Sequence, residues 1–267
     1  MVKLMEFLNS EMERPNPYGW FHLMFVGISL LLVVYFFITR KKSSEKELKI
    51  VLLVYGIVAL IFELLKQIAW SYNLDSVTGK IIWDYQWYAA PYQLCTTPIY
   101  VSLLYFIFKN KNIKESLLAF LAFFTLWGSI MTMIIPDSCF VRTILVNIHT
   151  MYLHCGSFVV SMYIIIKRKI PSTFKTFLKA YKVFLIFAGL ALFVDLLFYH
   201  TGIIGDETFN MFYISPYFIS SLPVFDTIQR SVPYLVFLFI YLLAFFLGGM
   251  LFYLLYKLYN RKKHDIL

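Results

Sequence analysis

Two side chains in the 267-residue sequence have the chemical character of a nucleophile and a base: the Cys95 thiol and the His154 imidazole. A thiol attacks a carbon centre as its thiolate, and an imidazole that accepts the thiol proton generates that thiolate. The two residues lie in separate apolar stretches and so belong to different helices. This pair predicts nucleophilic chemistry, and an inert buried cysteine is the alternative interpretation of Cys95.

The other cysteines and histidines form no familiar metal or redox motif. The sequence has no Cys-x-x-Cys pair, no Cys/His zinc spacing, no His-Glu-x-x-His and no phosphate-binding loop. Cys139 is predicted in a loop and Cys155 about 16 Å deep in the next helix, too far apart for a disulfide. We therefore expect no metal site and no cofactor.

The elements that position these residues are predicted to be membrane helices. The sequence is 60% hydrophobic and only 15% charged, whereas soluble domains are roughly 25% charged. Seven apolar stretches have the length of about 20 residues that a spanning helix needs. They cover residues 21–39, 50–70, 88–108, 116–135, 144–166, 183–199 and 233–256. This pattern predicts an all-α polytopic membrane protein, a bundle of seven transmembrane helices that forms a single domain over residues 1–267.

The distribution of basic residues predicts the orientation of this bundle. Eighteen of the 24 Lys and Arg residues follow the first, third, fifth and seventh stretches. Lysine and arginine accumulate in short cytoplasmic connections, which predicts an N-terminus outside and a cytoplasmic C-terminus. The net charge of +9 therefore indicates topology and attraction to anionic lipid, and no nucleic-acid partner is expected.

Three carboxylate or ammonium side chains fall inside predicted spans, where an unpaired charge costs about 3 kcal/mol. They are Glu63, Lys66 and Asp195. Glu63, Lys66 and Gln67 share one helix face, so an ion pair between Glu63 and Lys66 is expected. Alternatively, Lys66 contacts the phosphate of a lipid headgroup. Asp195 is expected either to pair with Lys66 or to orient His154, and the sequence does not choose between these roles.

The fifth span carries a polar stripe that includes His154. The stripe steps by three and four residues, as one face of a helix does. It consists of Asn147, Thr150, His154, Ser157 and Ser161. His149 lies about 140° around the helix from His154 and falls outside the stripe. Small hydroxyl side chains in membranes commonly serve helix packing, whereas an imidazole there indicates a relay or a binding site.

The third span, which contains Cys95, is predicted to be interrupted. Pro98 removes one backbone hydrogen bond inside this helix, and such irregular backbone at membrane depth is tolerated where it lines a cavity. At 1.5 Å per residue, Cys95 lies about 10 Å and His154 about 15 Å below their outer helix ends. The charged residues of the other spans also fall in the outer half. The sequence thus predicts a pocket open toward the extracytoplasmic leaflet.

Three segments of the sequence resemble a known family. They are Pro91-Tyr92-Gln93-Leu94-Cys95, the segment from Asn147 to His154, and Asn210-Met211-Phe212-Tyr213 followed by Pro216 and Pro233-Tyr234. These segments are similar to the YwaF family of bacterial membrane proteins. That family is related to the eukaryotic Transmembrane protein 164 acyltransferases and, more distantly, to the androgen-induced-gene hydrolases. The similarity covers most of the chain and implies seven helices in a bacterial cell membrane.

The resemblance implies a Cys/His acyltransferase, or a lipid ester hydrolase, whose partners are membrane lipids. It assigns Cys95 as the nucleophile and His154 as the base. Thr96 and Thr97 are weaker alternatives, because the distant hydrolases use Thr. An acyl transfer also needs hydrogen-bond donors for the developing oxyanion. The candidate donors are the side-chain amides of Gln93, Asn147 and Asn210.

A non-enzymatic role is the alternative to this chemistry. A small-molecule transporter subunit or a lipid-binding membrane scaffold would use the same outer pocket. Transporters often contain paired repeats and broken helices in both halves, whereas this sequence shows no internal repeat. Dependence on the Cys95 thiol separates the two interpretations, because a transport pocket has no need for a thiolate.

Overall fold

The computed structural model describes residues 2–75, 77–136, 139–168 and 170–264, in which helices joined by loops predominate and the only strands form one short hairpin. The long helices are α2 (Trp20–Ile38), α3 (Glu45–Ser71), α7 (Ile144–Lys167), α8 (Phe174–Thr201) and α10 (Tyr234–His264). A middle segment runs through α5 (Lys111–Phe120), the π-helical turn η2 (Leu121–Thr125) and α6 (Leu126–Ile134). The shorter elements are α1 (Val2–Leu8), β1 (Tyr72–Leu74), β2 (Ile81–Trp83), η1 (Trp87–Ala89), α4 (Thr97–Ile107), η4 (Met211–Tyr213) and α9 (Phe225–Ser231).

In the described part of the chain, 6 helices are long and apolar enough to cross a membrane. They correspond to the predicted spans 21–39, 50–70, 116–135, 144–166, 183–199 and 233–256. The protein is therefore an all-helical, multi-pass membrane protein, as its composition predicts. Long apolar helices satisfy their backbone groups internally, which hydrocarbon requires of any spanning segment.

The third predicted span, 88–108, has a different structure. Its α-helix is α4, which has 11 residues, and irregular backbone precedes α4 at residues 90–96. The prediction that Pro98 interrupts a longer helix is wrong, because Pro98 lies in the first turn of α4. There the missing N–H removes no helix hydrogen bond. Cys95 consequently lies in the irregular segment rather than within a helix.

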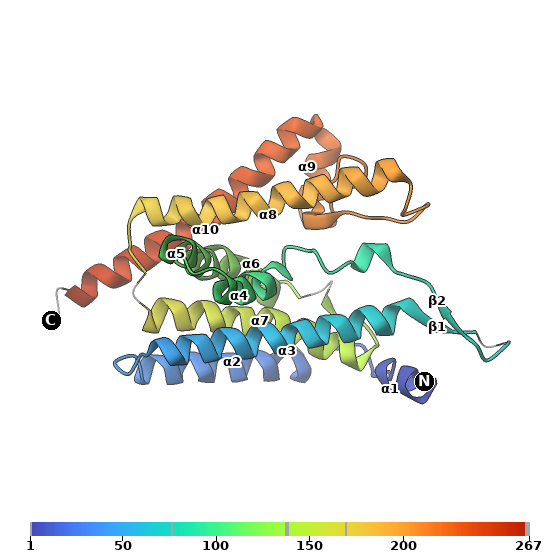
Figure 1. The fold of residues 1–267 in the computed structure, drawn as a ribbon, viewed down its shortest axis with the longest axis horizontal. Coiled ribbons are helices and arrows are strands. Elements are labelled where there is room, and N and C mark those ends of the chain that lie inside the picture. The colour runs from blue at the N-terminus through green and yellow to red at the C-terminus, as the bar shows by residue number, and fades with distance from the viewer. Residues whose placement is uncertain (1, 76, 137–138, 169, 265–267) are drawn as a thin grey trace.

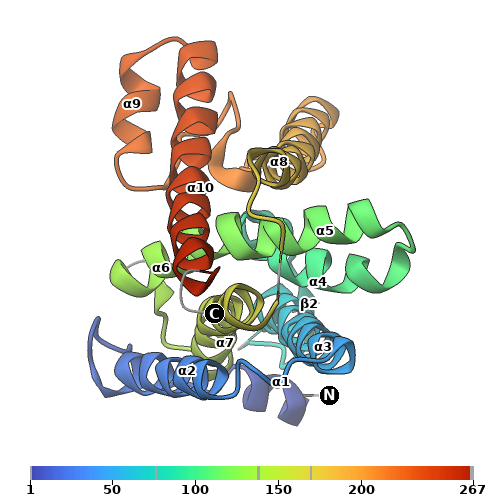
Figure 2. The ribbon, with the colours of Figure 1, turned by 90° about the vertical axis from the view of Figure 1, so that its left-hand side faces the viewer.

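The helices form layers that cross one another. In Figure 1, α2, α3 and α7 run along the lower side and α8 along the upper side, while α4 and α5 are viewed almost end-on. Figure 2 shows α4, α5 and α6 lying across the view between these groups. α5 packs against α8, and η2 packs against both α7 and α10. The segment from α5 to α6 is thus the central element, and its apolar window has the highest buried share of the 6 candidate spans, 61%.

Aromatic rings fill the core around the π-helical turn. Phe124 stacks on Phe184 and Phe177, with ring centroids 5.5 Å and 5.9 Å apart. The Ser161 hydroxyl of α7 donates to the Leu121 carbonyl at 2.6 Å. A π-helical turn shifts the backbone hydrogen bonds of a helix, and here a polar side chain of the neighbouring helix satisfies one of its carbonyls.

We expect Gly249→Ala to lower the free energy of unfolding by about 1 to 3 kcal/mol, because the added methyl group would overpack the core. A Cβ at Gly249 would lie 2.7 Å from the Phe124 ring, which is held in the aromatic stack. The matched control is Gly189→Ala in α8, where an added Cβ meets nothing within 4 Å. Thermal unfolding of the purified proteins in detergent measures the difference. An equal loss in both variants would contradict this packing.

Candidate intramembrane polar site

Cys95 lies on a tight turn directly before α4. The Thr96 hydroxyl fixes this turn, since it accepts from the Gln93 backbone N–H at 3.0 Å and donates to the Gln93 carbonyl at 2.8 Å. Thr96 is also the N-cap residue of α4, so Cys95 directly precedes the positive end of the α4 dipole. Cys95 keeps part of its surface accessible, whereas Thr96 and Thr97 are buried.

The turn that holds Cys95 is tied to a segment more than a hundred residues later. Gln93 Nε2 donates to the Asn210 carbonyl at 3.1 Å, and the Phe212 backbone N–H donates to Gln93 Oε1 at 3.1 Å. Asn210 is itself held by its own loop, because its Oδ1 accepts from the Ser215 N–H at 2.9 Å. Gln93 and Asn210 are therefore brought together, and their amides bind backbone groups.

Asp195 supports the same segment from α8. Its Oδ1 accepts from the Met211 backbone N–H at 2.8 Å, and the side chain is buried. Within the described residues, Asp195 forms no ion pair with Lys66 and no hydrogen bond with His154. Both roles expected for Asp195 are therefore absent, and its partner is a backbone donor that the sequence does not reveal.

Two consecutive residues in this segment have an unusual backbone conformation. Phe212 and Tyr213 have positive φ values of 56° and 60°, which are strained for bulky side chains. Hydrogen bonds to Gln93 and from the Tyr241 hydroxyl to the Phe212 carbonyl, at 2.7 Å, hold this conformation. The turn brings Tyr213 into electrostatic range of Cys95. Tyr213 was not among the candidates from sequence, because backbone strain leaves no sequence signal here.

A second polar network surrounds the buried Glu63 carboxylate. Glu63 Oε1 lies 2.6 Å from Lys66 Nζ, which confirms the predicted ion pair, and accepts from Gln67 Nε2 at 2.9 Å. Lys66 and Gln67 both also donate to the Ala89 carbonyl, at 3.2 Å and 2.6 Å. Glu63 Oε2 lies 3.0 Å from His149 Nε2. His149 is not among the site residues predicted from the sequence. The signal that could have identified it is the buried carboxylate of Glu63, because such a group needs more than one partner.

The two networks meet around Cys95. The Cys95 thiol interacts electrostatically with Lys66 and Glu63 of one network and with Tyr213 of the other. His154 is partly exposed and interacts electrostatically with His149. Within the described residues, no hydrogen bond joins Cys95 to His154. Cys95 thus has charged and polar neighbours, and His154 is not among the groups found to interact with it in the part of the chain that the structure describes.

Asn147 has a local structural partner. Its Oδ1 accepts from the Val141 N–H at 2.9 Å, and its Nδ2 donates to the Val141 carbonyl at 2.8 Å. These two bonds hold the backbone that leads into α7. The side-chain amides of all three oxyanion candidates, Gln93, Asn147 and Asn210, are therefore bonded to backbone groups.

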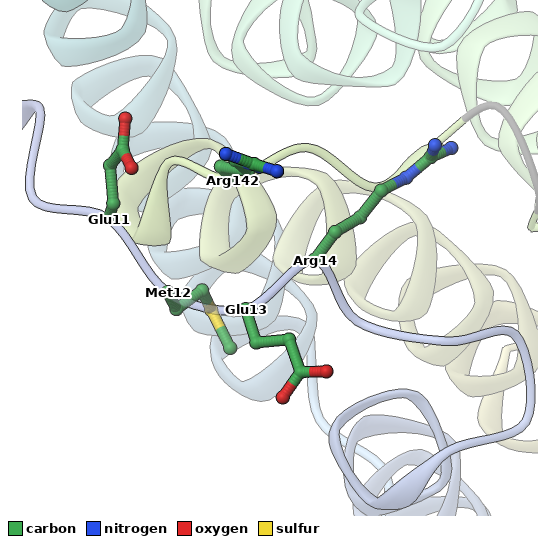
Figure 3. A pocket seen from close by; sticks show the side chains of 5 residues that line it. All are labelled: Glu11, Met12, Glu13, Arg14 and Arg142. Carbon is green, nitrogen blue, oxygen red and sulfur yellow. The ribbon is translucent and has the colours of Figure 1, made fainter.

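A surface cavity of about 480 Å³ lies elsewhere, between the N-terminal segment and the start of α7 (Figure 3). The side chains that line it are Glu11, Met12, Glu13, Arg14 and Arg142. In Figure 3, Arg14 and Arg142 extend to the same side of the N-terminal segment, while Glu13 points to the other. Neither Cys95 nor His154 lines this cavity, so it is separate from the candidate site.

A family model described as the TMEM164 family matches residues 17–258. The chain belongs to the TMEM164 family. This match confirms the resemblance to the YwaF and Transmembrane protein 164 proteins, and it spans all the residues of the candidate site. Comparisons with curated proteins and with solved structures found no match.

In this TMEM164-family chain, we expect Glu63→Gln to lower the free energy of unfolding by about 3 kcal/mol, because it leaves the buried Lys66 ammonium without its carboxylate. The control is Glu115→Gln, which breaks a partly exposed ion pair with Lys179 of 2.9 Å and should cost less than about 1 kcal/mol. Thermal unfolding in detergent measures both effects.

The double variant Glu63→Gln/Lys66→Met separates a buried charge from a general loss of packing. It should recover part of the stability lost in Glu63→Gln, since it removes the uncompensated ammonium. Equal stability of the single and double variants would contradict the ion pair as the dominant interaction.

Proposed function

We propose that this TMEM164-family membrane protein is a lipid acyltransferase, or a lipid ester hydrolase, with Cys95 as its nucleophile. The observation that carries the proposal is the position of Cys95: a partly accessible thiol in the irregular segment directly before α4, within electrostatic range of both Lys66 and Glu63. A substrate can reach such a thiol, and an adjacent base has to generate the anionic sulfur that attacks an ester. A cysteine that served packing alone would need neither accessible surface nor charged neighbours.

The proposed reaction has two steps. Cys95 Sγ bonds to the acyl carbonyl carbon of a lipid ester while the thiol proton passes to His154, and the alkoxy oxygen then leaves with that proton. A hydroxyl of a second lipid, or water, next loses its proton to His154 as its oxygen attacks the thioester, and Sγ leaves and is reprotonated. The Cys95 to His154 hydrogen bond forms when substrate is bound, since catalytic hydrogen bonds are often long in unliganded sites.

Tyr213 is the proposed oxyanion donor. The three amides expected for this role already bond to backbone groups. Two other tyrosines in electrostatic range of Cys95 are also engaged, because Tyr55 bonds to Ser157 and Tyr100 donates to the Pro91 carbonyl. Tyr213 is in electrostatic range of Cys95 and Cys139, and its hydroxyl has a side-chain hydrogen bond with the Ser221 hydroxyl. An oxyanion hole of this kind is typically worth about 3 kcal/mol in the transition state.

Incubation of the purified chain with nitrophenyl butyrate should produce an acyl thioester on Cys95, which intact-mass spectrometry detects and hydroxylamine releases. Cys95→Ala should abolish the adduct because the nucleophile is gone. The matched control is Cys155→Ala, which removes a buried thiol of α7 and should leave the adduct in place. An adduct that persists in Cys95→Ala would contradict the assignment and favour a transporter subunit or lipid-binding scaffold.

The base assignment has its own test. The burst of nitrophenolate released during acylation should be slowed at least about 100-fold in His154→Ala, the usual loss when a general base is removed. His149→Ala is the matched comparison, because it removes the other imidazole of α7, which pairs with Glu63. A larger loss of burst rate in His149→Ala than in His154→Ala would reverse the assignment of the base.

The site is proposed to open to the outer leaflet of a bacterial plasma membrane. The proposed topology has seven crossings, with the N-terminus outside, the C-terminus cytoplasmic, and residues 87–107 as the third crossing through η1, the irregular segment and α4. Support comes from the basic residues that follow alternate spans. The partners proposed for the site are membrane lipids.

A further inference from the structure

A second cavity, of about 420 Å³, lies where α3 begins, α4 ends, α5 begins and the connection after α7 starts. Four basic and two acidic residues line it. They are Lys109, Lys111, Lys114 and Arg168, with Glu45 and Glu115. The cavity lies apart from Cys95 and His154, neither of which lines it, and the proposed reaction does not use it.

Both acidic side chains of this cavity are already neutralised. Glu45 pairs with Arg168 at 2.7 Å, and Glu115 pairs with Lys179 at 2.9 Å. Lys114 lies over the Tyr105 ring, 4.6 Å from its centroid. In the residues that the structure describes, Lys109 and Lys111 lie within ion-pair distance of no carboxylate. The cavity therefore has an excess of positive charge.

The helix that begins in the cavity adds to this positive charge. α5 has Lys111 and Lys114 at its start and no acidic residue in its first turn. The N-terminus of a helix carries partial positive charge and unpaired N–H groups, so lysines there are unfavourable and an anion is favourable. The Asn110 side chain accepts from only one of these donors, the Asn112 N–H. The lysines at the start of α5 are thus repelled by the positive end of its helix dipole, and a bound anion would offset this repulsion.

We propose that this cavity binds the phosphate group of an anionic phospholipid. Lys109, Lys111 and the first turn of α5 hold the phosphate, because each supplies positive charge or N–H donors at the same place. Leu118, Ile170 and Pro171 also line the cavity. These apolar side chains give the glycerol and acyl part of a lipid a surface that inorganic phosphate would not use.

The test compares thermal unfolding of the full-length chain in dodecyl maltoside with three additives. These are dioleoylphosphatidylglycerol, which is anionic, dioleoylphosphatidylcholine, which is zwitterionic, and inorganic phosphate. The anionic lipid should raise the unfolding temperature by roughly 5 °C at saturation, and the other two should not. A rise with inorganic phosphate alone would overturn the lipid source of the anion, and equal rises with both lipids would overturn the anion site.

The variant Lys109→Gln/Lys111→Gln should lose the lipid-dependent rise while its unfolding temperature without lipid stays equal or increases. That increase is expected because the substitutions remove unfavourable charges from the α5 N-terminus. The matched control, Lys41→Gln/Lys257→Gln, removes two exposed lysines that do not line the cavity and should keep the full rise. An undiminished rise in Lys109→Gln/Lys111→Gln, or an equal loss in the control, would overturn the proposal.

Discussion

The buried carboxylate of Glu63 is the interaction on which the arrangement of the site depends. Hydrocarbon offers no water to a charged group, so an intramembrane carboxylate has to be surrounded by donors of the protein itself. Glu63 Oε1 meets this requirement with Lys66 and Gln67 of its own helix, and its Oε2 lies 3.0 Å from His149 Nε2 of α7. Through Lys66 and Gln67 the same network also holds the Ala89 carbonyl. One charge thereby fixes α3, α7 and the start of the segment that contains Cys95.

Nearby hydroxyl groups satisfy the irregular backbone around Cys95. The Thr96 hydroxyl donates to the Gln93 carbonyl, and the segment is also linked to a distant part of the chain. Residues 90–96 cannot use helix hydrogen bonds, and irregular backbone is stable at membrane depth only where protein groups replace water. Gln93 provides this link by bonding to Asn210 and Phe212, while Asp195 holds the neighbouring Met211. The strained conformation of Phe212 and Tyr213 is maintained by these same bonds. The partly exposed thiol thus interacts with groups of both polar networks.

Much of this structure could be predicted from sequence, and the exceptions have physical causes. Apolar length identified the 6 candidate spans, and the shared face of Glu63 and Lys66 identified their ion pair. The position of Pro98 was misinterpreted, because a proline at the start of a short helix and one inside a long helix look alike in an apolar stretch. The predicted partners of Asp195 are the side chains of Lys66 and His154, whereas its partner in the structure is the Met211 backbone N–H. The proposed role of Tyr213 as oxyanion donor depends on its positive φ, and the residue types of this segment do not indicate that backbone conformation.

The identity of the residue that carries an acyl chain tests the central claim most directly. The purified chain would be incubated in vesicles of phosphatidylcholine with isotopically labelled acyl chains, then digested and mapped by mass spectrometry. The account predicts a labelled, hydroxylamine-sensitive acyl group on the peptide that contains Cys95, and on no other cysteine peptide. A labelled chain on Cys139, Cys155 or a threonine, or no covalent label while lipid is turned over, would contradict it.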